Sequence, residues 1–475
     1  MHPACRSRRD FFQWGTNGLA ATALATLLHE EAQATKPTTT RTAAPHAKAK
    51  RAIQICLVGG LSHLDSFDHK PELTRLHGST LKTDEEVDLF FGQMGLLRKE
   101  DWVFRPRGES GLMISDLFPE IAGHADDLTI LRSMESKSAN HTPALFLANS
   151  GFEFNGFPSM GSWVSYGLGV ENESLPAYVV LNDERGAPNT GSSTWSSAFL
   201  PSSHQGVVLH GGDTPVRDLF PASPIDPAAD RDTQAFIRAI NALQTPAGDA
   251  DAAIAARLES YELAARMQTS IPAVASLADE SPATLEAYGV TNPATADMAR
   301  RCLLGRRLLE EGVRFVQLFS GGPIAGTPRA SWDAHENVKE NHTAEAARID
   351  RPVAALLADL KQRGMLDDTL VLFTTEFGRT PFAQSAADQV GPGRDHNRYG
   401  FTCWMAGAGC KPGIAVGSTD EIGWKAAERP IPWHDFHATV LHLFGIDHEQ
   451  LTYYHNGIER RLTNVHGELV TEALA

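Results

Sequence analysis

Cysteines, basic segments and long apolar runs are all scarce in this sequence, and each absence excludes a class of protein. Only 5 of the 475 residues are cysteine, and none pair at the short spacing of a zinc-binding motif. The formal net charge is −16, which argues against a nucleic-acid binder that neutralises phosphates. Beyond the N-terminal region, no apolar run is long enough for a transmembrane helix. A large, acidic globular protein remains.

The cysteines indicate packing rather than chemistry. Cys56 and Cys403 lie in apolar, strand-like runs, where a free cysteine usually packs as a small hydrophobic residue. A disulfide between Cys403 and Cys410 is compatible with an oxidising compartment, but the sequence does not assign one.

The N-terminal region carries the features of an export signal. Residues 7–12 read SRRDFF, a paired arginine followed by bulky apolar residues, as in twin-arginine signals. A modest apolar stretch and a small-x-small cleavage site at 32–34 follow. We therefore predict a twin-arginine signal peptide over residues 1–34 and a disordered linker over 35–50. The protein is expected in the periplasm or cell envelope, delivered by the twin-arginine export machinery. The alternative is a basic amphipathic helix that stays in the mature protein.

Six short apolar runs, rich in β-branched residues, predict buried strands. They lie at 53–58, 128–131, 178–181, 314–319, 370–375 and 401–405. Apolar residues at helical spacing from Val353 to Leu360 precede the fifth run, with Asp350 as the expected cap and Pro352 in the first turn. A helix followed by a short turn and a strand is half of an α/β unit, so the predicted fold class is α/β.

The remaining segments predict how the domain is organised. Residues 182–310 form an excursion, which begins as a loop rich in glycine, serine and proline and continues as alanine-rich helices at 235–243 and 258–267. Another helix is expected to open at Asp435.

Possible metal ligands and acid–base groups recur where the predicted strands end. They are Asp65 after the first strand, His141 and Thr142 after the second, Asp333 and His335 after the fourth, and Glu376, Asp395 and His396 after the fifth. Ligands of open α/β sheets bind beyond the carboxyl ends of the strands, so this recurrence predicts one shared site. Each residue alone has a structural alternative: a turn-forming aspartate, a solvated histidine, or, for Asp333, a helix cap.

One placement needs a particular topology. His396 stands before the strand at 401–405 rather than after it. For His396 to join a site at the carboxyl ends, that strand has to run antiparallel or the loop has to reach over. The Asp-x-His pair at 333–335 suits a divalent metal, because aspartate supplies a hard oxygen and histidine a borderline nitrogen.

Seven stretches together resemble a bacterial family of unknown function common in planctomycetes, the domain of unknown function 1501. They are LVGGLSHLDSFDHKP, NHTPALFLANSGF, PSMGSWVSYGLG, SWDAHEN, GMLDDTLVLFTTEFGRTP, GRDHNRYGFTCWMAGAGCKPG and HATVLHLFGID. That family is in turn similar to the alkaline phosphatase and sulfatase superfamily. The resemblance implies a single alkaline-phosphatase-like α/β domain over 51–475, with a central, mostly parallel sheet, helices on both faces and two divalent-metal subsites at the sheet edge.

The resemblance also implies roles for single residues. Glu376 stands for the metal-binding aspartate of a Thr-x-Asp-His motif, and Phe377 stands where a metal-binding histidine belongs. His396 resembles the late metal-binding histidine, and Asp333 with His335 resembles the aspartate and histidine of the same subsite. Asp65 stands for the aspartate after the first strand.

The nucleophile is where the sequence departs from the superfamily. NHTPALFLANSG resembles the Cys-x-Pro-Ser-Arg stretch of sulfatases, with His141 at the nucleophile position and Thr142 one residue away from it. No formylglycine precursor is present, so sulfatase chemistry by that route is not expected.

We therefore expect an exported, metal-dependent hydrolase acting on a phosphate or sulfate ester, either a small anionic molecule or a polysaccharide. A divalent metal, zinc, manganese or calcium, would be held by Asp65, Asp333, His335, Glu376, Asp395 and His396. His141 would act as an acid–base group or nucleophile, or Thr142 would attack, while Arg379 and Arg394 would clamp the anion. The alternative is a binding or scaffold protein that keeps the fold without the chemistry. A weaker third hypothesis is a phosphoglycerate-mutase-like transferase.

Overall fold

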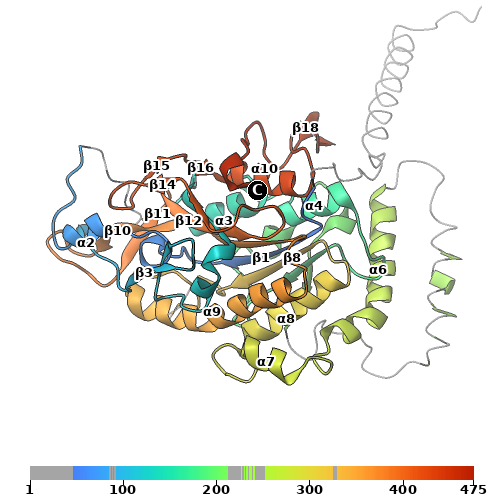
Figure 1. The fold of residues 1–475 in the computed structure, drawn as a ribbon. Coiled ribbons are helices and arrows are strands. Elements are labelled where there is room, and N and C mark those ends of the chain that lie inside the picture. The colour runs from blue at the N-terminus through green and yellow to red at the C-terminus, as the bar shows by residue number, and fades with distance from the viewer. Residues whose placement is uncertain are drawn as a thin grey trace, which may run out of the picture.

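The computed structural model describes residues 47–84, 93–211, 252–324 and 329–475, with a few isolated residues between these ranges (Figure 1). The predicted signal peptide at 1–34 and most of the linker at 35–50 lie outside the described residues, as does part of the helix predicted at 235–243. Among the helices of the described part, none is both long enough and apolar enough to cross a membrane.

A nine-stranded sheet organises the molecule, in the order β13-β5-β12-β9-β1-β8-β6-β7 with β16 paired to β5. Every pairing in it is parallel except those of β12. All six predicted strands are present, and the predicted mostly parallel α/β sheet is confirmed. The strands are β1 (Arg51–Leu57), β5 (Leu128–Glu135), β6 (Tyr178–Leu181), β7 (Val207–Leu209), β8 (Phe315–Ser320), β9 (Thr369–Thr375), β12 (Phe401–Ala406), β13 (Ile414–Val416) and β16 (Ile431–Pro432).

The antiparallel strand is β12, the strand that had to run antiparallel for His396 to join a site at the carboxyl ends. β12 runs antiparallel to both β9 and β5, with Trp404 opposite Phe373 of β9. A strand that runs antiparallel to its neighbours begins at the edge of the sheet where those neighbours end. The segment that leads into β12, which contains His396, therefore lies beside the carboxyl end of β9.

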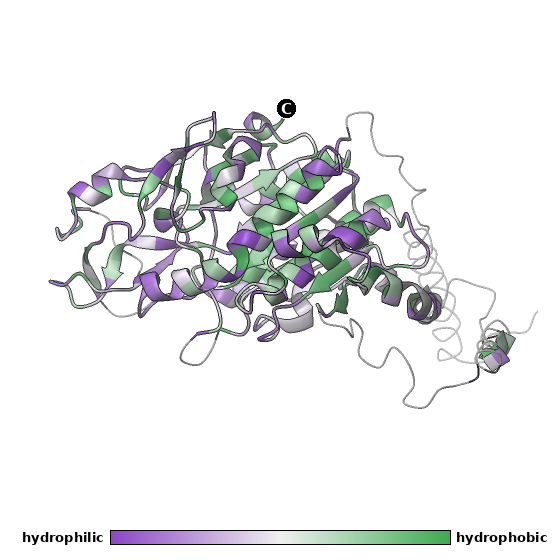
Figure 2. Ribbon diagram, turned by 60° about the horizontal axis from the view of Figure 1, so that its bottom comes forward, coloured by the Kyte–Doolittle hydropathy of each residue, from purple (hydrophilic) through white to green (hydrophobic). Residues whose placement is uncertain are grey.

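Helices cover both faces of the sheet (Figure 1). On one face lie α3 (His141–Ser150), α4 (Met160–Leu168) and α10 (Trp433–Leu443), and on the other α6 (Ala252–Ala275), α7 (Pro282–Tyr288), α8 (Ala296–Glu310) and α9 (Val338–Gln362). β1 sends Ile53 and Ile55 into one core and Cys56 into the other, which is why its sequence is a nearly continuous apolar run. In Figure 2 the apolar residues gather along this sheet and its covering helices.

Smaller sheets flank the central one. β2 (Met94–Leu97), β10 (Gly378–Gln384) and β11 (Arg394–Asn397) form a three-stranded sheet. The two-stranded sheets pair β3 (Phe104–Arg107) with β4 (Leu112–Ser115), β14 (Ser418–Thr419) with β15 (Ala426–Glu428), and β17 (Tyr453–His455) with β18 (Ile458–Arg460). A short helix, α2 (Pro71–Arg75), and 3-10 turns such as η1 (His63–Asp65) and η3 (Gly191–Trp195) lie in the connections between strands.

The helix before β9 is longer than the sequence predicted, and its expected cap has another role. α9 begins at Val338, where the Asn337 side chain accepts a hydrogen bond from the Glu340 backbone, so Pro352 lies inside the helix. The Asp350 carboxylate instead accepts hydrogen bonds from the backbone nitrogens of Glu120 and Ile121. Periodicity marked only the most apolar half of α9. The prediction that Asp350 caps the helix is wrong.

The described cysteines and the charged surface agree with the composition. Cys56, Cys302, Cys403 and Cys410 are all buried and free, so the Cys403–Cys410 disulfide is not formed.

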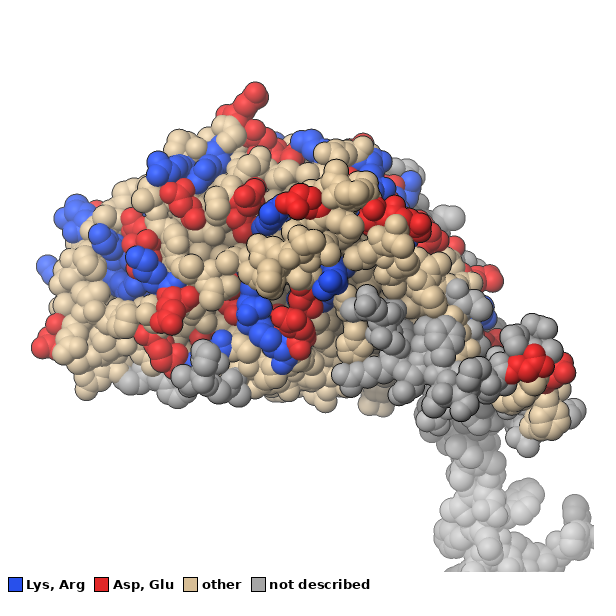
Figure 3. Space-filling view, turned by 90° about the horizontal axis from the view of Figure 1, so that it is seen from below, with Lys and Arg blue, Asp and Glu red and all other residues tan. Residues whose placement is uncertain are grey.

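The helix predicted to open at Asp435 is α10, which begins two residues earlier at Trp433. On the face seen in Figure 3, acidic and basic side chains alternate without gathering into one basic patch.

Candidate metal centre

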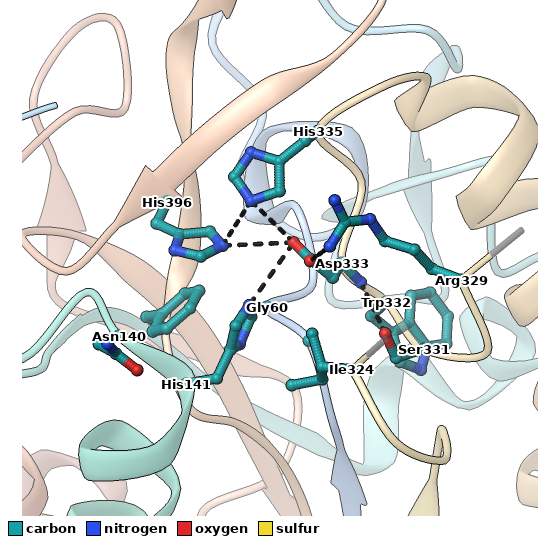
Figure 4. Close-up of polar contacts among 12 residues, drawn as sticks. Gly60, Asn140, His141, Ile324, Arg329, Ser331, Trp332, Asp333, His335 and His396 are labelled. Atoms are coloured by element: carbon teal, nitrogen blue, oxygen red, sulfur yellow. Dashed lines mark hydrogen bonds and ion pairs between the residues drawn. The ribbon is translucent and has the colours of Figure 1, made fainter. Parts of the chain in front are cut away.

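Four side chains converge at the carboxyl edge of the sheet (Figure 4). Asp333 and His335 lie in the loop after β8, His396 lies in β11, and His141 is the first residue of α3. Asp333 Oδ1 is 3.0 Å from His335 Nε2, 3.2 Å from His396 Nε2 and 3.5 Å from His141 Nε2. We call these four residues the histidine–aspartate cluster. Three of them were predicted from the sequence as metal ligands, and His141 was predicted as a catalytic group.

A glycine at the end of β1 allows the loop that carries Asp333 to come close. Gly59 has a φ of +120°, and a Cβ there would lie 2.4 Å from the Asp333 backbone nitrogen. The Trp332 backbone nitrogen donates to the Val58 carbonyl at 2.8 Å, and its indole Nε1 donates to Ser320 Oγ at 3.1 Å. These bonds hold Asp333 over the ends of β1 and β8.

Hydrogen bonds to the outer ring nitrogens decide which atoms face the centre. The Ala139 carbonyl can only accept, so His396 Nδ1 donates to it at 2.7 Å and His396 Nε2 directs a lone pair inward. In the same way His335 Nδ1 donates to Gln384 Oε1. The inward nitrogens of His335 and His396 lie only 2.8 Å apart. Two lone pairs and a carboxylate oxygen thus meet at one point, an arrangement that a cation satisfies.

His141 reaches the cluster from the first turn of helix α3. Its Nδ1 donates to Glu376 Oε1 at 2.8 Å, and its Nε2 is buried without a hydrogen-bond partner among the described residues. Donor atoms of His141, Asp333 and His396 lie within 4.8 Å of one another, and so do those of His335, Asp395 and His396. A buried polar atom that no group satisfies is uncommon in folded proteins and points to a missing ligand.

The protonation states suit metal binding for two of the four residues. Burial alone would raise the pKa of Asp333, but Arg379 and the three histidines outweigh it and hold the pKa far below its ordinary value. Burial lowers the pKa of His396 well below its ordinary value, so the ring is neutral. For His141, burial lowers the pKa, but the nearby carboxylates of Asp333 and Glu376 outweigh burial and raise it. His141 therefore keeps a proton to higher pH than His396 does, and any such proton has to leave before the ring binds a metal.

Glu376 supports the cluster from behind. Its Oε1 accepts from His141 Nδ1 and from the Gly59 backbone nitrogen, both at 2.8 Å. It belongs to neither set of donor atoms that could share an ion within the described residues. Phe377 packs beside it, with its ring centroid 4.8 Å from that of His141 and 4.5 Å from that of His396. In the structure Glu376 therefore supports His141 from behind. The sequence-based hypothesis had assigned Glu376 as a metal ligand.

Asp65 also lies outside the cluster. Its Oδ2 lies 2.9 Å from Arg394 Nε, and its two oxygens accept further hydrogen bonds from Ser62 Oγ and the Asp101 backbone nitrogen. Asp65 and Arg394 are both fully buried, so each neutralises the other. This pairing replaces both expectations, Asp65 as a metal ligand and Arg394 as an anion clamp.

Arg379 binds the protein rather than a substrate. It is fully buried, and its guanidinium donates to the carbonyl of Gly60 at 2.9 Å, to Asp333 Oδ1 at 2.7 Å and to the carbonyl of Arg394 at 3.3 Å. Because its donors are already used, the expected role of Arg379 as an anion clamp is not supported. It balances the charge of Asp333 instead.

The two other predicted residues lie beside the cluster. Asp395 Oδ1 accepts a hydrogen bond from the His396 backbone nitrogen at 2.8 Å and lies 3.8 Å from His335 Nδ1. Thr142 is exposed on the first turn of α3, next to His141. Its side chain is open to solvent and belongs to neither group of residues that could share an ion.

Three supporting groups were not predicted from the sequence. They are the Ala139 carbonyl, Gln384 of β10, and Arg329, which pairs with Asp333 Oδ2 and lies 2.8 Å from Glu336. Arg329 precedes Asp333 by four residues, which is a possible local signal. Gln384 is brought to His335 only by the small sheet of β10 and β11, and a local pattern contains no such information.

Comparison with known proteins gives the family. The family described as "Protein of unknown function (DUF1501)" matches residues 49–474. The chain belongs to this family. The match confirms the family predicted from the sequence motifs. No curated protein matches the sequence.

Solved structures similar to this family member are distant in sequence. An alkaline phosphatase mutant from the Antarctic bacterium TAB5, with magnesium bound, is 12% identical with a TM-score of 0.37, covering 84% of this chain and 98% of that one. The lipoteichoic acid synthase LtaP from Listeria monocytogenes is 10% identical with a TM-score of 0.36, covering 88% and 76%. The PsFucS1 sulfatase from Pseudoalteromonas sp. is 12% identical with a TM-score of 0.34, covering 88% and 72%. At these scores the likeness carries no argument about activity.

Proposed function

We propose that the histidine–aspartate cluster binds a divalent metal ion and that the chain hydrolyses a phosphate or sulfate ester there. One observation carries the proposal. His335 and His396 aim Nε2 atoms at Asp333 Oδ1 while their outer nitrogens are committed to Gln384 and Ala139. Such second hydrogen bonds are typical of histidines that bind metals, because they fix the tautomer and the ring orientation.

The donor set favours zinc among the candidate ions. Three imidazole nitrogens and one carboxylate oxygen are ligands that zinc prefers. Calcium takes six to eight oxygen ligands, which these residues do not offer. Manganese is the second candidate, since it favours carboxylate oxygen. When bound, such an ion supplies Lewis acidity that polarises an ester oxygen.

The protein's own residues prepare the site for an anionic ester. α3 begins at His141, so the positive end of the helix dipole faces the cluster and favours a negative group there. Glu376 holds His141 in one orientation, and Arg379 offsets the charge of Asp333. In this proposal the exposed Thr142 hydroxyl is the nucleophile, with an attacking water as the alternative.

The N-terminal sequence supports the proposal that the chain acts outside the cytoplasm. Twin-arginine export carries proteins that are already folded, so the chain would leave the cytoplasm with its metal in place. Arg8→Lys combined with Arg9→Lys should leave the chain in the cytoplasmic fraction. Immunoblotting of cell fractions measures this. Normal export of the double variant would contradict the signal assignment.

A non-catalytic scaffold is the second candidate, and one observation favours it. Asp333 Oδ1 lies 3.0 Å from His335 Nε2, 3.2 Å from His396 Nε2 and 3.5 Å from His141 Nε2, so four protein ligands would close a tetrahedral site. Closed zinc sites are structural, whereas catalytic zinc keeps a position open. The scaffold would thus bind the same metal as the hydrolase, but it would not hydrolyse an ester.

Metal content and ester hydrolysis, measured on the same purified protein, separate the two functions. We expect about one zinc ion per chain, with hydrolysis of p-nitrophenyl phosphate or p-nitrophenyl sulfate that a chelator abolishes. His396→Ala should lose both the metal and the activity, while His77→Ala, an exposed control, should keep both. Stoichiometric metal without hydrolysis would support the scaffold. Protein that binds no divalent metal would overturn both.

A further inference from the structure

A row of aromatic side chains lies beyond the far end of α3. Phe152 stacks on Phe157 with ring centroids 3.7 Å apart, and Phe157 meets Phe199 edge-on at 6.1 Å. Phe199 in turn stacks on His455 at 4.8 Å and on Tyr453 at 5.9 Å. We call these five residues the aromatic strip. All five are half-buried, although a closed core would cover such rings completely.

Three separate segments build the aromatic strip. Phe152 and Phe157 lie in the loop after α3, Phe199 lies in the excursion that leads to β7, and Tyr453 with His455 forms β17. Neither the metal cluster nor its supporting groups include any of these residues. The strip therefore has no part in the proposed ester hydrolysis site itself.

An arginine without a counter-ion borders the strip. The Arg460 guanidinium lies over the Phe157 ring, 6.0 Å from its centroid. Its Nε is buried without a hydrogen-bond partner, and its side chain forms no ion pair with any described residue. The buried arginines Arg306 and Arg394, by contrast, pair with carboxylates. Glu459 precedes Arg460 on β18 and points to the opposite face of the hairpin, because side chains alternate along a strand.

We propose that the aromatic strip and Arg460 form a binding site for an anionic polysaccharide. Aromatic rings offer broad, rigid apolar surfaces on which the C–H faces of sugar rings pack. A guanidinium binds the oxygens of a sulfate, phosphate or carboxylate group through parallel hydrogen bonds. The combination of half-exposed rings with one unpaired positive charge matches sugars that carry an anionic substituent.

α3 links the strip to the metal cluster. The helix starts at His141 and has 10 residues, and the cap at Gly151 is followed directly by Phe152. A helix of that length spans about 15 Å. A ligand that touches both ends must therefore be an oligomer, and this connection rests on the proposed hydrolase function. Binding at the strip does not depend on it.

Binding to three polymers tests the proposal. Dextran sulfate carries sugars and anionic groups, unmodified dextran carries sugars only, and polyphosphate carries charge only. Isothermal titration should show that the full chain binds dextran sulfate more tightly than either of the others. Phe199→Leu and Arg460→Gln should each weaken dextran sulfate binding at least tenfold. Phe199→Leu keeps an apolar side chain at that position, and thermal melting confirms that each variant folds.

Arg75→Gln is the matched control, since Arg75 is an exposed arginine in α2, far from β18 (Figure 1). Its dextran sulfate affinity should equal that of the unchanged chain. Unchanged binding in both strip variants would overturn the proposal and leave a protein partner as the occupant. An equal loss in Arg460→Gln and Arg75→Gln would also overturn it, as general ion exchange. Chelated protein should bind as before, so a failed metal site and a failed strip give different results.

Discussion

Glu376 shows how one buried carboxylate can act on a site that it does not line. It accepts hydrogen bonds from His141 Nδ1 and from the Gly59 backbone nitrogen, and it is fully buried. The first contact fixes a ring of the cluster, and the second fixes the glycine against which Asp333 packs. A single residue at the end of β9 therefore positions two others that come from distant parts of the chain.

Glu376→Gln should weaken metal binding without unfolding the protein. The amide keeps the size of the carboxylate but removes its charge and one of its acceptors. Loss of such a supporting group typically lowers metal affinity about 10- to 100-fold. Competition with a zinc-binding dye measures this change. Glu72→Gln, at a half-buried position of α2 outside the cluster, serves as the control, and equal affinities in the two variants would contradict the role of Glu376.

Gly59→Ala should disrupt the cluster through the backbone. The new Cβ would lie 2.4 Å from the Asp333 nitrogen, closer than real contacts allow, so the loop has to move. Gly78→Ala is the matched control, because Gly78 also has a positive φ, +81°, but no atom within 4 Å of the built Cβ. We expect both variants to lose about 1–2 kcal/mol from backbone strain, and only Gly59→Ala to lose its metal. Elemental analysis with urea unfolding measures both effects.

At the scale of elements, α10 holds the helix that carries His141. His437 Nε2 donates to the Ala148 carbonyl at 2.9 Å, and His434 Nε2 donates to the Gly151 carbonyl at 2.8 Å. Both acceptors belong to the last turn and cap of α3, whose carbonyls have no partner within the helix. The C-terminal helix thus fixes the end of α3 opposite the cluster.

This contact predicts a loss of stability in mild acid. Burial lowers the pKa of His437 from 6.5 to about 3, so the folded protein keeps the ring neutral. The unfolded chain binds a proton below pH 6.5, so the stabilisation is complete above that pH and is lost as the pH falls toward 3. Each proton taken up only on unfolding costs about 1.4 kcal/mol per pH unit. His437→Gln should make the decline between pH 6 and 4 shallower by about one proton.

Urea unfolding at several pH values checks this slope. His77→Gln is the control, since His77 is exposed. His434, whose pKa burial lowers to about 4, still titrates in both variants and supplies the remaining slope. A His437→Gln slope equal to that of the unchanged protein would show that the contact between α10 and α3 opens before the ring takes up its proton.

At the scale of the whole molecule, the cluster joins segments that the fold brings together. Asp333 follows β8, His396 precedes β12 and His141 opens α3, so an ion bound there would cross-link the sheet to one of its helical layers. Zinc at 100 times its dissociation constant should therefore raise the free energy of unfolding by about 2.7 kcal/mol. His396→Ala should abolish that gain, while His466→Ala, an exposed control, should keep it. A gain that survives in His396→Ala would place the metal elsewhere.

Much of the fold, and part of the candidate site, could be predicted from local sequence patterns. The six apolar runs became strands because a buried parallel strand is apolar on both faces, and this signal needs no knowledge of partners. The positions of Asp333, His335 and His396 followed from their place at strand ends. Asp350 was misassigned because periodicity does not show where a long amphipathic helix starts. Asp65 was misassigned because the sequence does not show that Arg394 lies beside it.

The sequence by itself determined the fold class, the family and the loops that carry the cluster. Hydrophobic period and residue type are local properties, and the chain states them directly. The tertiary structure alone decided the role of each polar residue. Glu376, Asp65, Arg379 and Arg394 are all buried, and a buried charge takes its role from the partner that satisfies it. Those partners lie tens to hundreds of residues away, so only the folded chain separates the groups that face a ligand from those that hold them in place.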